Sequence, residues 1–149
     1  MKKLPDLTLA ASGGKDISLK DYKGKALVLY FYPKDNTPGC TQEGIDFRDL
    51  YKDFKKAGAE VLGVSRDSVR SHENFIEKYK FPFPLLSDPD EKLCKAFDVI
   101  QEKSLYGRKY MGVDRSTFLF DKSGALRQEW RGVKVKGHAE EVLAAVKAL

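Results

Sequence analysis

YFYPKDNTPGCTQEG, residues 30–44, carries the chain from an apolar run into an amphipathic segment. The run itself, residues 26–32, is almost continuously apolar, which is typical of a strand that is covered on both faces. Beyond it, apolar residues recur at spacings of three and four, which predicts a helix from about Pro38 to Ala57 that ends at Gly58. The stretch is therefore interpreted as a strand-to-helix connection in an α/β protein.

Cys40 falls in the first turn of this predicted helix. Thr37 is expected at the N-cap and Pro38 at the first helical position, where a missing N–H is harmless, so that Cys40 takes the third position. Free backbone N–H groups and the positive end of the helix dipole stabilise a thiolate there. An ordinary thiol is only about 3% ionised at pH 7, and the thiolate is the nucleophilic form. Because this placement favours the thiolate, Cys40 is a candidate nucleophile.

The segment PKDNTPGC resembles the active-site signature of the peroxiredoxins, Pro-x-x-x-Thr-x-x-Cys, through Pro33, Thr37 and Cys40. Its continuation CTQEGIDFRD is similar to the PrxQ, or bacterioferritin comigratory protein, subfamily, and Glu43 falls on the acidic position of that subfamily. Further matching segments span nearly the whole chain in order: KGKALVLYFYPK, VLGVSRDSVRSHENF, FPLLSDPDEKL and YGRKYMGVDRSTFLFDKSG.

The resemblance implies a thioredoxin-like α/β fold with an N-terminal hairpin and a central mixed sheet flanked by helices. The periodicity along the chain fits this fold, and one domain is expected over residues 1–149. The expected strands are 26–32, 60–65, a short one within 81–88, and the hairpin 116–120 with 126–130; the expected helices are 69–79, a short one within 88–97, and 138–149; residues 7–22 are expected to add the N-terminal hairpin.

The same resemblance implies a thiol peroxidase that reduces hydrogen peroxide and organic hydroperoxides as Cys40 becomes a sulfenic acid. Arg115 would bind the peroxide and hold Cys40 ionised, the Thr37 hydroxyl would donate to the developing charge, and Pro33 would shield the thiolate from solvent. Taken without the resemblance, Cys40 reads as a small buried apolar residue, Thr37 as a helix cap and Arg115 as a surface arginine. Glu43 could complement the helix dipole or act near the site, and both interpretations stay open.

The sequence departs from the family pattern at the residues that would reduce the oxidised Cys40 again. Many PrxQ proteins carry a resolving cysteine at one of two positions that are Ile45 and Ile76 here, and the C-terminal Val-Cys-Pro of dimeric two-cysteine peroxiredoxins is missing. Cys94 lies on the apolar side of a short predicted helix and is interpreted as a buried structural thiol. We therefore expect a one-cysteine enzyme that is restored by thioredoxin or by glutathione with glutaredoxin, with a Cys40–Cys94 disulfide as the alternative.

Two other classes of protein would also use a reactive cysteine at the position of Cys40. A thiol-disulfide oxidoreductase would need a second cysteine near Cys40, but Thr37 stands where a CxxC motif would place it. A redox sensor or holdase would use Cys40 without sustained turnover.

Composition limits the classes of binding partner and the cellular location that are expected. The 149 residues carry a net charge of +5 from 27 basic and 22 acidic side chains that are interleaved, without the basic block that nucleic-acid binding favours. No apolar run is long enough for a signal peptide or a membrane span, so a cytoplasmic location is expected. Neither a cofactor nor a metal is expected; His72 and His138 are predicted to be exposed helix residues. The resemblance to PrxQ suggests a monomer.

Overall fold

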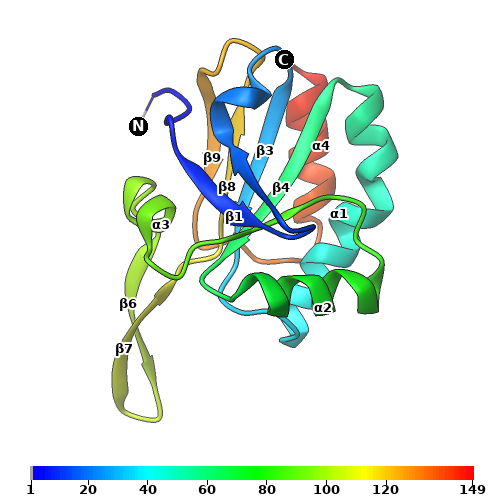
Figure 1. Cartoon of the computed structure of the whole chain (residues 1–149). Helices are drawn as coiled ribbons and strands as arrows, with labels where there is room; N and C mark the ends of the chain where they lie inside the picture. The colour runs from blue at the N-terminus through cyan, green and yellow to red at the C-terminus, as the bar shows by residue number, and fades with distance from the viewer. Residues whose placement is uncertain (1) are drawn as a thin grey trace.

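A seven-stranded mixed sheet lies at the centre of the computed structural model, which describes residues 2–149 (Figure 1). The strand order is β2-β1-β5-β4-β3-β8-β9, and β6 and β7 form a separate two-stranded sheet. The strands are β1 Thr8–Ala11, β2 Lys15–Ser18, β3 Ala26–Phe31, β4 Ala59–Ser65, β5 Leu85–Ser87, β6 Ile100–Leu105, β7 Arg108–Val113, β8 Ser116–Phe120 and β9 Leu126–Trp130. The helices are α1 Pro38–Lys56, α2 Val69–Tyr79, α3 Lys92–Ala96 and α4 His138–Lys147, with a 3-10 turn at Leu19–Tyr22.

Strand β3 is the central element, and it pairs in parallel with β4 and antiparallel with β8. All six of its residues are buried, as expected of a strand covered on both faces. Its side chains alternate between two apolar clusters on opposite faces of the sheet, because successive residues of a strand point to opposite sides. Val28 and Tyr30 join one cluster, and Leu29 and Phe31 join the other.

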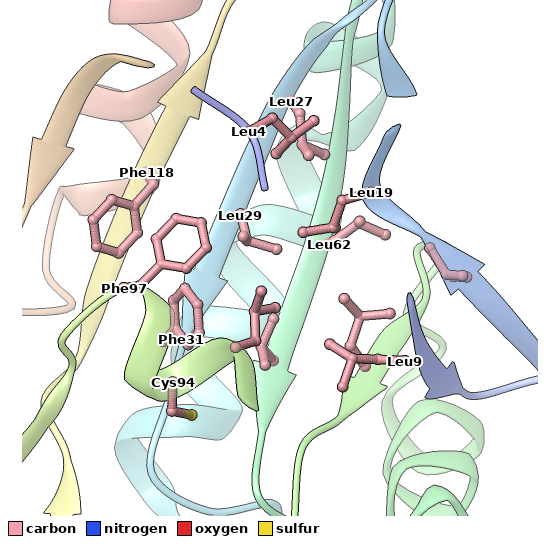
Figure 2. Packing of buried hydrophobic residues seen from close by; sticks show 14 of the residues in the cluster. Leu4, Leu9, Leu19, Leu27, Leu29, Phe31, Leu62, Cys94, Phe97 and Phe118 are labelled. Atoms are coloured by element: carbon pink, nitrogen blue, oxygen red, sulfur yellow. The ribbon is translucent and has the colours of Figure 1, made fainter. Parts of the chain in front are cut away.

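The two clusters are covered by different elements. The first, here called the α1 cluster, gathers side chains from three helices: Cys40, Phe47 and Phe54 of α1, Phe75 of α2, and Val142 and Val146 of α4. The second, here called the α3 cluster, gathers the following residues from α3, its flank and the N-terminal segments, many of which Figure 2 shows packed together: Leu4, Leu9, Leu19, Leu93, Cys94 and Phe97. The sheet thus has an α1 side and an α3 side.

The thioredoxin-like fold with its N-terminal hairpin is confirmed. The bounds of α2, β8 and β9 are those that the pattern predicts, and α1, β3 and β4 agree to within one residue at each end. The last helix ends at Lys147 instead of Leu149, whose side chain is 46% exposed. None of the helices in residues 2–149 combines the length and the apolar character that crossing a membrane requires.

Two features differ from the sequence-based expectation. His72 and His138 were expected to be exposed, but both are buried, because each satisfies its ring with internal partners. Nε2 of His138 lies 2.8 Å from the Thr117 hydroxyl, and His72 belongs to a polar network near Cys40. The β6–β7 hairpin was not predicted, and in Figure 1 it projects away from the central sheet. Its strands are mostly exposed and lack the regular alternation of polar and apolar residues that marks a half-buried strand.

Candidate active site around Cys40

Cys40 occupies the first turn of α1, after the loop that leaves β3. Pro38 and Gly39 are the first two helical residues, so Cys40 holds the third position, as its spacing predicts. The residue is only 2% exposed and packs within the α1 cluster. The thiol is free, and it lies at the N-terminal end of α1, where the helix dipole is positive.

Thr37 is the N-cap residue of α1 by backbone conformation, but within residues 2–149 its side chain makes no capping hydrogen bond. Its hydroxyl instead donates to the carbonyl oxygen of Lys34 over 2.7 Å. The capping expectation is therefore correct for the position and wrong for the side chain. Donation from Thr37 to a substrate oxygen would require the hydroxyl to exchange this partner.

Arg115 lies between Cys40 and Glu43. It follows β7 and precedes β8, and its Nη2 is 3.3 Å from the Cys40 sulfur while its Nη1 donates to Oε1 of Glu43 over 2.7 Å. Glu43 is one turn beyond Cys40 in α1, so both side chains face the same guanidinium. The Arg115 side chain is only 16% exposed, so it is not the solvent-exposed arginine that its sequence context alone would indicate.

Burial sets the electrostatics of this trio. It raises the pKa of Glu43 to about 7 even though Arg115 lowers it, and Oε2 of Glu43 has no hydrogen-bond partner among residues 2–149. For Arg115, burial lowers the pKa, but Glu43 and Cys40 outweigh it and raise the pKa above its usual value. The guanidinium charge is therefore retained beside the sulfur, where it can stabilise negative charge.

Gly39 is a site residue that the sequence analysis missed. A Cβ built on Gly39 would lie 3.1 Å from Nη2 of Arg115, so glycine leaves the guanidinium room to approach the sulfur. The only sequence signal is a glycine at the second helical position, where its low helix propensity gives no local advantage.

A buried polar network fixes the loop between β3 and α1. Nδ1 of His72 is 2.8 Å from Oδ2 of Asp35, and its Nε2 is 2.8 Å from the carbonyl oxygen of Leu86 in β5. Tyr32 donates from its hydroxyl to Oδ1 of Asp35 over 2.6 Å, and Ser71 donates to Oδ2 over 2.8 Å. The network joins the loop before Cys40 to α2 and β5, and nothing in the sequence pattern pairs Asp35 with His72.

Pro33 follows Tyr32 in this loop and is partly buried. It lies beside the network, on the strand-to-helix connection that leads to Cys40. Shielding of the sulfur by Pro33 stays a prediction.

Cys94 lies on the other side of the sheet. It is fully buried in the α3 cluster (Figure 2). Cys40 belongs to the α1 cluster. Burial and the neighbouring Asp88 carboxylate, which accepts from the Cys94 backbone N–H, raise the pKa of its thiol. Ile45 and Ile76 both pack against the α1 cluster.

Metal ligands do not gather in the described chain. Among residues 2–149 no group of three or more histidine, cysteine, aspartate or glutamate side chains is arranged to hold a metal ion. The reactive groups that the structure brings together are a thiol, a guanidinium and a carboxyl. This set can present an ionised sulfur to an electrophile and stabilise negative charge beside it.

Comparison with known proteins gives consistent matches over nearly the whole chain. Residues 1–129 match the model of the AhpC/TSA family. Peroxiredoxin Bcp of Xanthomonas campestris is 59% identical over 96% of this chain and 89% of its own. The solved structure of Xanthomonas campestris peroxiredoxin Q has a TM-score of 0.93 at 58% identity and covers 98% of this chain and 95% of its own. A structure of the bacterioferritin comigratory protein of that organism, described with its alkyl peroxide reduction activity, has a TM-score of 0.93 at 57% identity and covers 98% and 96%.

Proposed function

The chain belongs to the AhpC/TSA family and, within it, to the Bcp/PrxQ peroxiredoxins, and from this premise we propose that Cys40 is the peroxidatic nucleophile of a one-cysteine thiol peroxidase. The Cys40 thiolate attacks the terminal oxygen of a hydroperoxide. A sulfur–oxygen bond forms as the oxygen–oxygen bond breaks, leaving Cys40 as sulfenic acid. The other oxygen departs as alkoxide or hydroxide and takes up a proton to become an alcohol or water.

The observation that carries this proposal is the placement of Arg115 between the Cys40 sulfur and the Glu43 carboxyl. Arginine keeps its charge at any working pH, so it can stabilise the thiolate before attack and the charge on the peroxide oxygens during it. Glu43 fixes the orientation of the guanidinium, and Gly39 leaves space for it. Thr37 is proposed to contribute a hydrogen bond to the peroxide, and Pro33 to limit solvent access.

Hydrogen peroxide and organic hydroperoxides are the proposed substrates. The bacterioferritin comigratory protein of Xanthomonas campestris, 57% identical to this chain, is described with alkyl peroxide reduction activity. We extend that substrate class to this chain. We also propose that it acts in the cytoplasm as a monomer, with residues 1–149 as one domain.

An external thiol is proposed to restore Cys40. The sulfenic acid condenses with the thiol to a mixed disulfide and water, and a second thiol then releases Cys40 and a disulfide. The position of Cys94 supports this route, because the β-sheet separates its cluster from that of Cys40 and a disulfide requires Cα atoms within about 7 Å. Thioredoxin and glutathione with glutaredoxin are the candidate donors.

Two serine variants test the proposal. Cys40→Ser should abolish the consumption of hydrogen peroxide and an alkyl hydroperoxide in the presence of thioredoxin or glutathione with glutaredoxin, because the nucleophile is removed. Cys94→Ser should retain most of the wild-type rate. Turnover by Cys40→Ser would contradict the assignment of the nucleophile, and loss of turnover in a folded Cys94→Ser variant would support the two-cysteine alternative.

A further inference from the structure

Exposed apolar side chains gather on the β6–β7 hairpin. Four of the five large apolar side chains that are exposed in the described chain lie within residues 105–111: Leu105 is 57% exposed, Tyr106 97%, Tyr110 47% and Met111 55%. Tyr106 occupies the hairpin tip with a left-handed backbone, beside Gly107. Exposed apolar side chains that gather on one short segment are typical of an interaction site.

The register divides this hairpin into two faces. Lys103 pairs with Tyr110 and Leu105 pairs with Arg108, so these four side chains share one face, here called the basic apolar face. A Cβ built on Gly112 would lie 3.1 Å from both Lys103 and Tyr110, which places them over the same side of β7. Met111, Glu102 and Lys109 lie on the opposite face.

The two faces differ in charge. Lys109 and Glu102 form an ion pair of 3.6 Å on the opposite face, which leaves that face balanced. The basic apolar face presents Lys103 and Arg108, and within the hairpin its register places no acidic side chain beside them. A partner that covers Leu105 and Tyr110 must therefore offer negative charge at the border of its contact.

The Lys103 end of the basic apolar face is connected to the segment that carries Arg115. The Lys103 ammonium donates to the carbonyl oxygen of Val113, two residues before Arg115. Burial lowers the pKa of Lys103, and Asp114, Arg115 and Cys40 are among the charges that act on it. A molecule seated on this face would thus contact a hairpin whose Lys103 end leads into the segment that carries Arg115.

We infer that the basic apolar face of the β6–β7 hairpin is the docking surface for a protein reductant whose reactive thiol is surrounded by acidic and apolar surface. The inference rests on the proposed function, because it assigns a place to the external thiol that restores Cys40. Lys103 and Arg108 steer the acidic partner, and Leu105 with Tyr110 supplies the desolvated contact.

Charge and apolar surface favour a protein reductant on this face over a second copy of the chain or a small thiol. A second copy of the chain would bring a net charge of +5 and the same two cations to the contact, which opposes self-association through this face. A small thiol needs no apolar surface to reach the sulfenic acid. A protein of opposite charge uses both features of the face.

Steady-state kinetics with two reductants test the inference. Turnover of an alkyl hydroperoxide is measured with thioredoxin of acidic surface as the protein thiol and with dithiothreitol as the small thiol. Leu105→Ser/Tyr110→Ser should raise the KM for thioredoxin about tenfold or more, because two central contacts are lost, and leave the dithiothreitol-driven rate unchanged. Met111→Ser, which removes an equally exposed apolar side chain from the opposite face, is the matched control and should leave both unchanged.

Charge reversal gives a second readout. Arg108→Glu should raise the KM for thioredoxin most at low ionic strength and weaken its dependence on salt. An unchanged KM in the double variant, an equal effect of Met111→Ser, or a wild-type enzyme that reacts no faster with thioredoxin than with dithiothreitol would overturn the inference. A dimer in sedimentation that the double variant dissociates would assign the face to self-association instead. Failure of the wild type to consume peroxide with dithiothreitol would instead count against the proposed function.

Discussion

Arg115 contacts the Cys40 sulfur and the Glu43 carboxyl at once, and this double contact explains the arrangement of the site at the scale of single residues. The guanidinium reaches the Cys40 sulfur through one nitrogen and Glu43 through another, while Gly39 leaves it room. A lysine has one compact charge and cannot reproduce this fork. The orientation of the charge beside the sulfur therefore depends on Glu43 as well as on Arg115.

The buried Glu43 carboxyl predicts a pH dependence of stability. Its pKa rises from 4.5 to about 7 on folding because of burial, so the folded protein holds this proton more tightly than the unfolded chain. Stability should then fall as pH rises from about 4.5 to 7 and level off above, with a slope of up to about 1.4 kcal/mol per pH unit from this group. Urea unfolding of the wild type and of Glu43→Gln measures it, since the variant lacks the titration. A difference between the two proteins that is the same at pH 5 and pH 8 would contradict the shift.

Sequence reasoning reached some site residues and missed others for identifiable reasons. Cys40 and Thr37 were placed by local helix rules, which depend only on neighbours in the chain. The position of Arg115 depends on a strand pairing 75 residues away from Cys40, and only the family resemblance pointed to it. Asp35 and His72 are 37 positions apart and carry no motif, so their contact could not be read from the pattern.

At the scale of elements, the contact between Asp35 and His72 joins the loop before Cys40 to helix α2. A carbonyl oxygen only accepts, so Nε2 of His72 donates to Leu86, while its Nδ1 lies 2.8 Å from Oδ2 of Asp35. The pair is therefore a buried polar contact between two elements. Removing one half of such a pair leaves the other polar group buried without its partner.

His72→Leu should lower the free energy of unfolding by about 1–3 kcal/mol, because it leaves the Asp35 carboxyl and the Leu86 carbonyl without this partner. Asp35→Asn/His72→Leu should recover part of that loss, since a neutral amide then replaces the carboxyl that had lost its partner. Urea unfolding of the two single variants and the double variant forms a double-mutant cycle. Strictly additive losses would contradict a coupled pair.

The elements that the sequence missed differ physically from those it predicted. The strands and helices of the central sheet bury at least one face, so their apolar periodicity reports their structure. The β6–β7 hairpin is mostly exposed, and its apolar residues follow no regular alternation, so no burial pattern marks it. Both histidines were misplaced because a buried imidazole depends on partners from distant elements.

At the scale of the whole molecule, the sheet separates the two cysteines. Cys40 belongs to the α1 cluster, with a guanidinium at its sulfur, and Cys94 belongs to the α3 cluster, where burial and Asp88 raise the pKa of its thiol. In the proposed mechanism the first thiol reacts with peroxide and the second does not. This division is the structural reason for the one-cysteine proposal, and it follows from the alternation of β3 between the two faces.

Intact-mass analysis after one equivalent of peroxide tests the central claim most directly. The wild-type protein should gain one oxygen atom at Cys40, and added glutathione should convert that product to a mixed disulfide at the same residue, as peptide mapping would locate. Cys94→Ser should behave in the same way. Loss of two hydrogen atoms in the wild type, with a Cys40–Cys94 disulfide in the peptide map, would contradict the account.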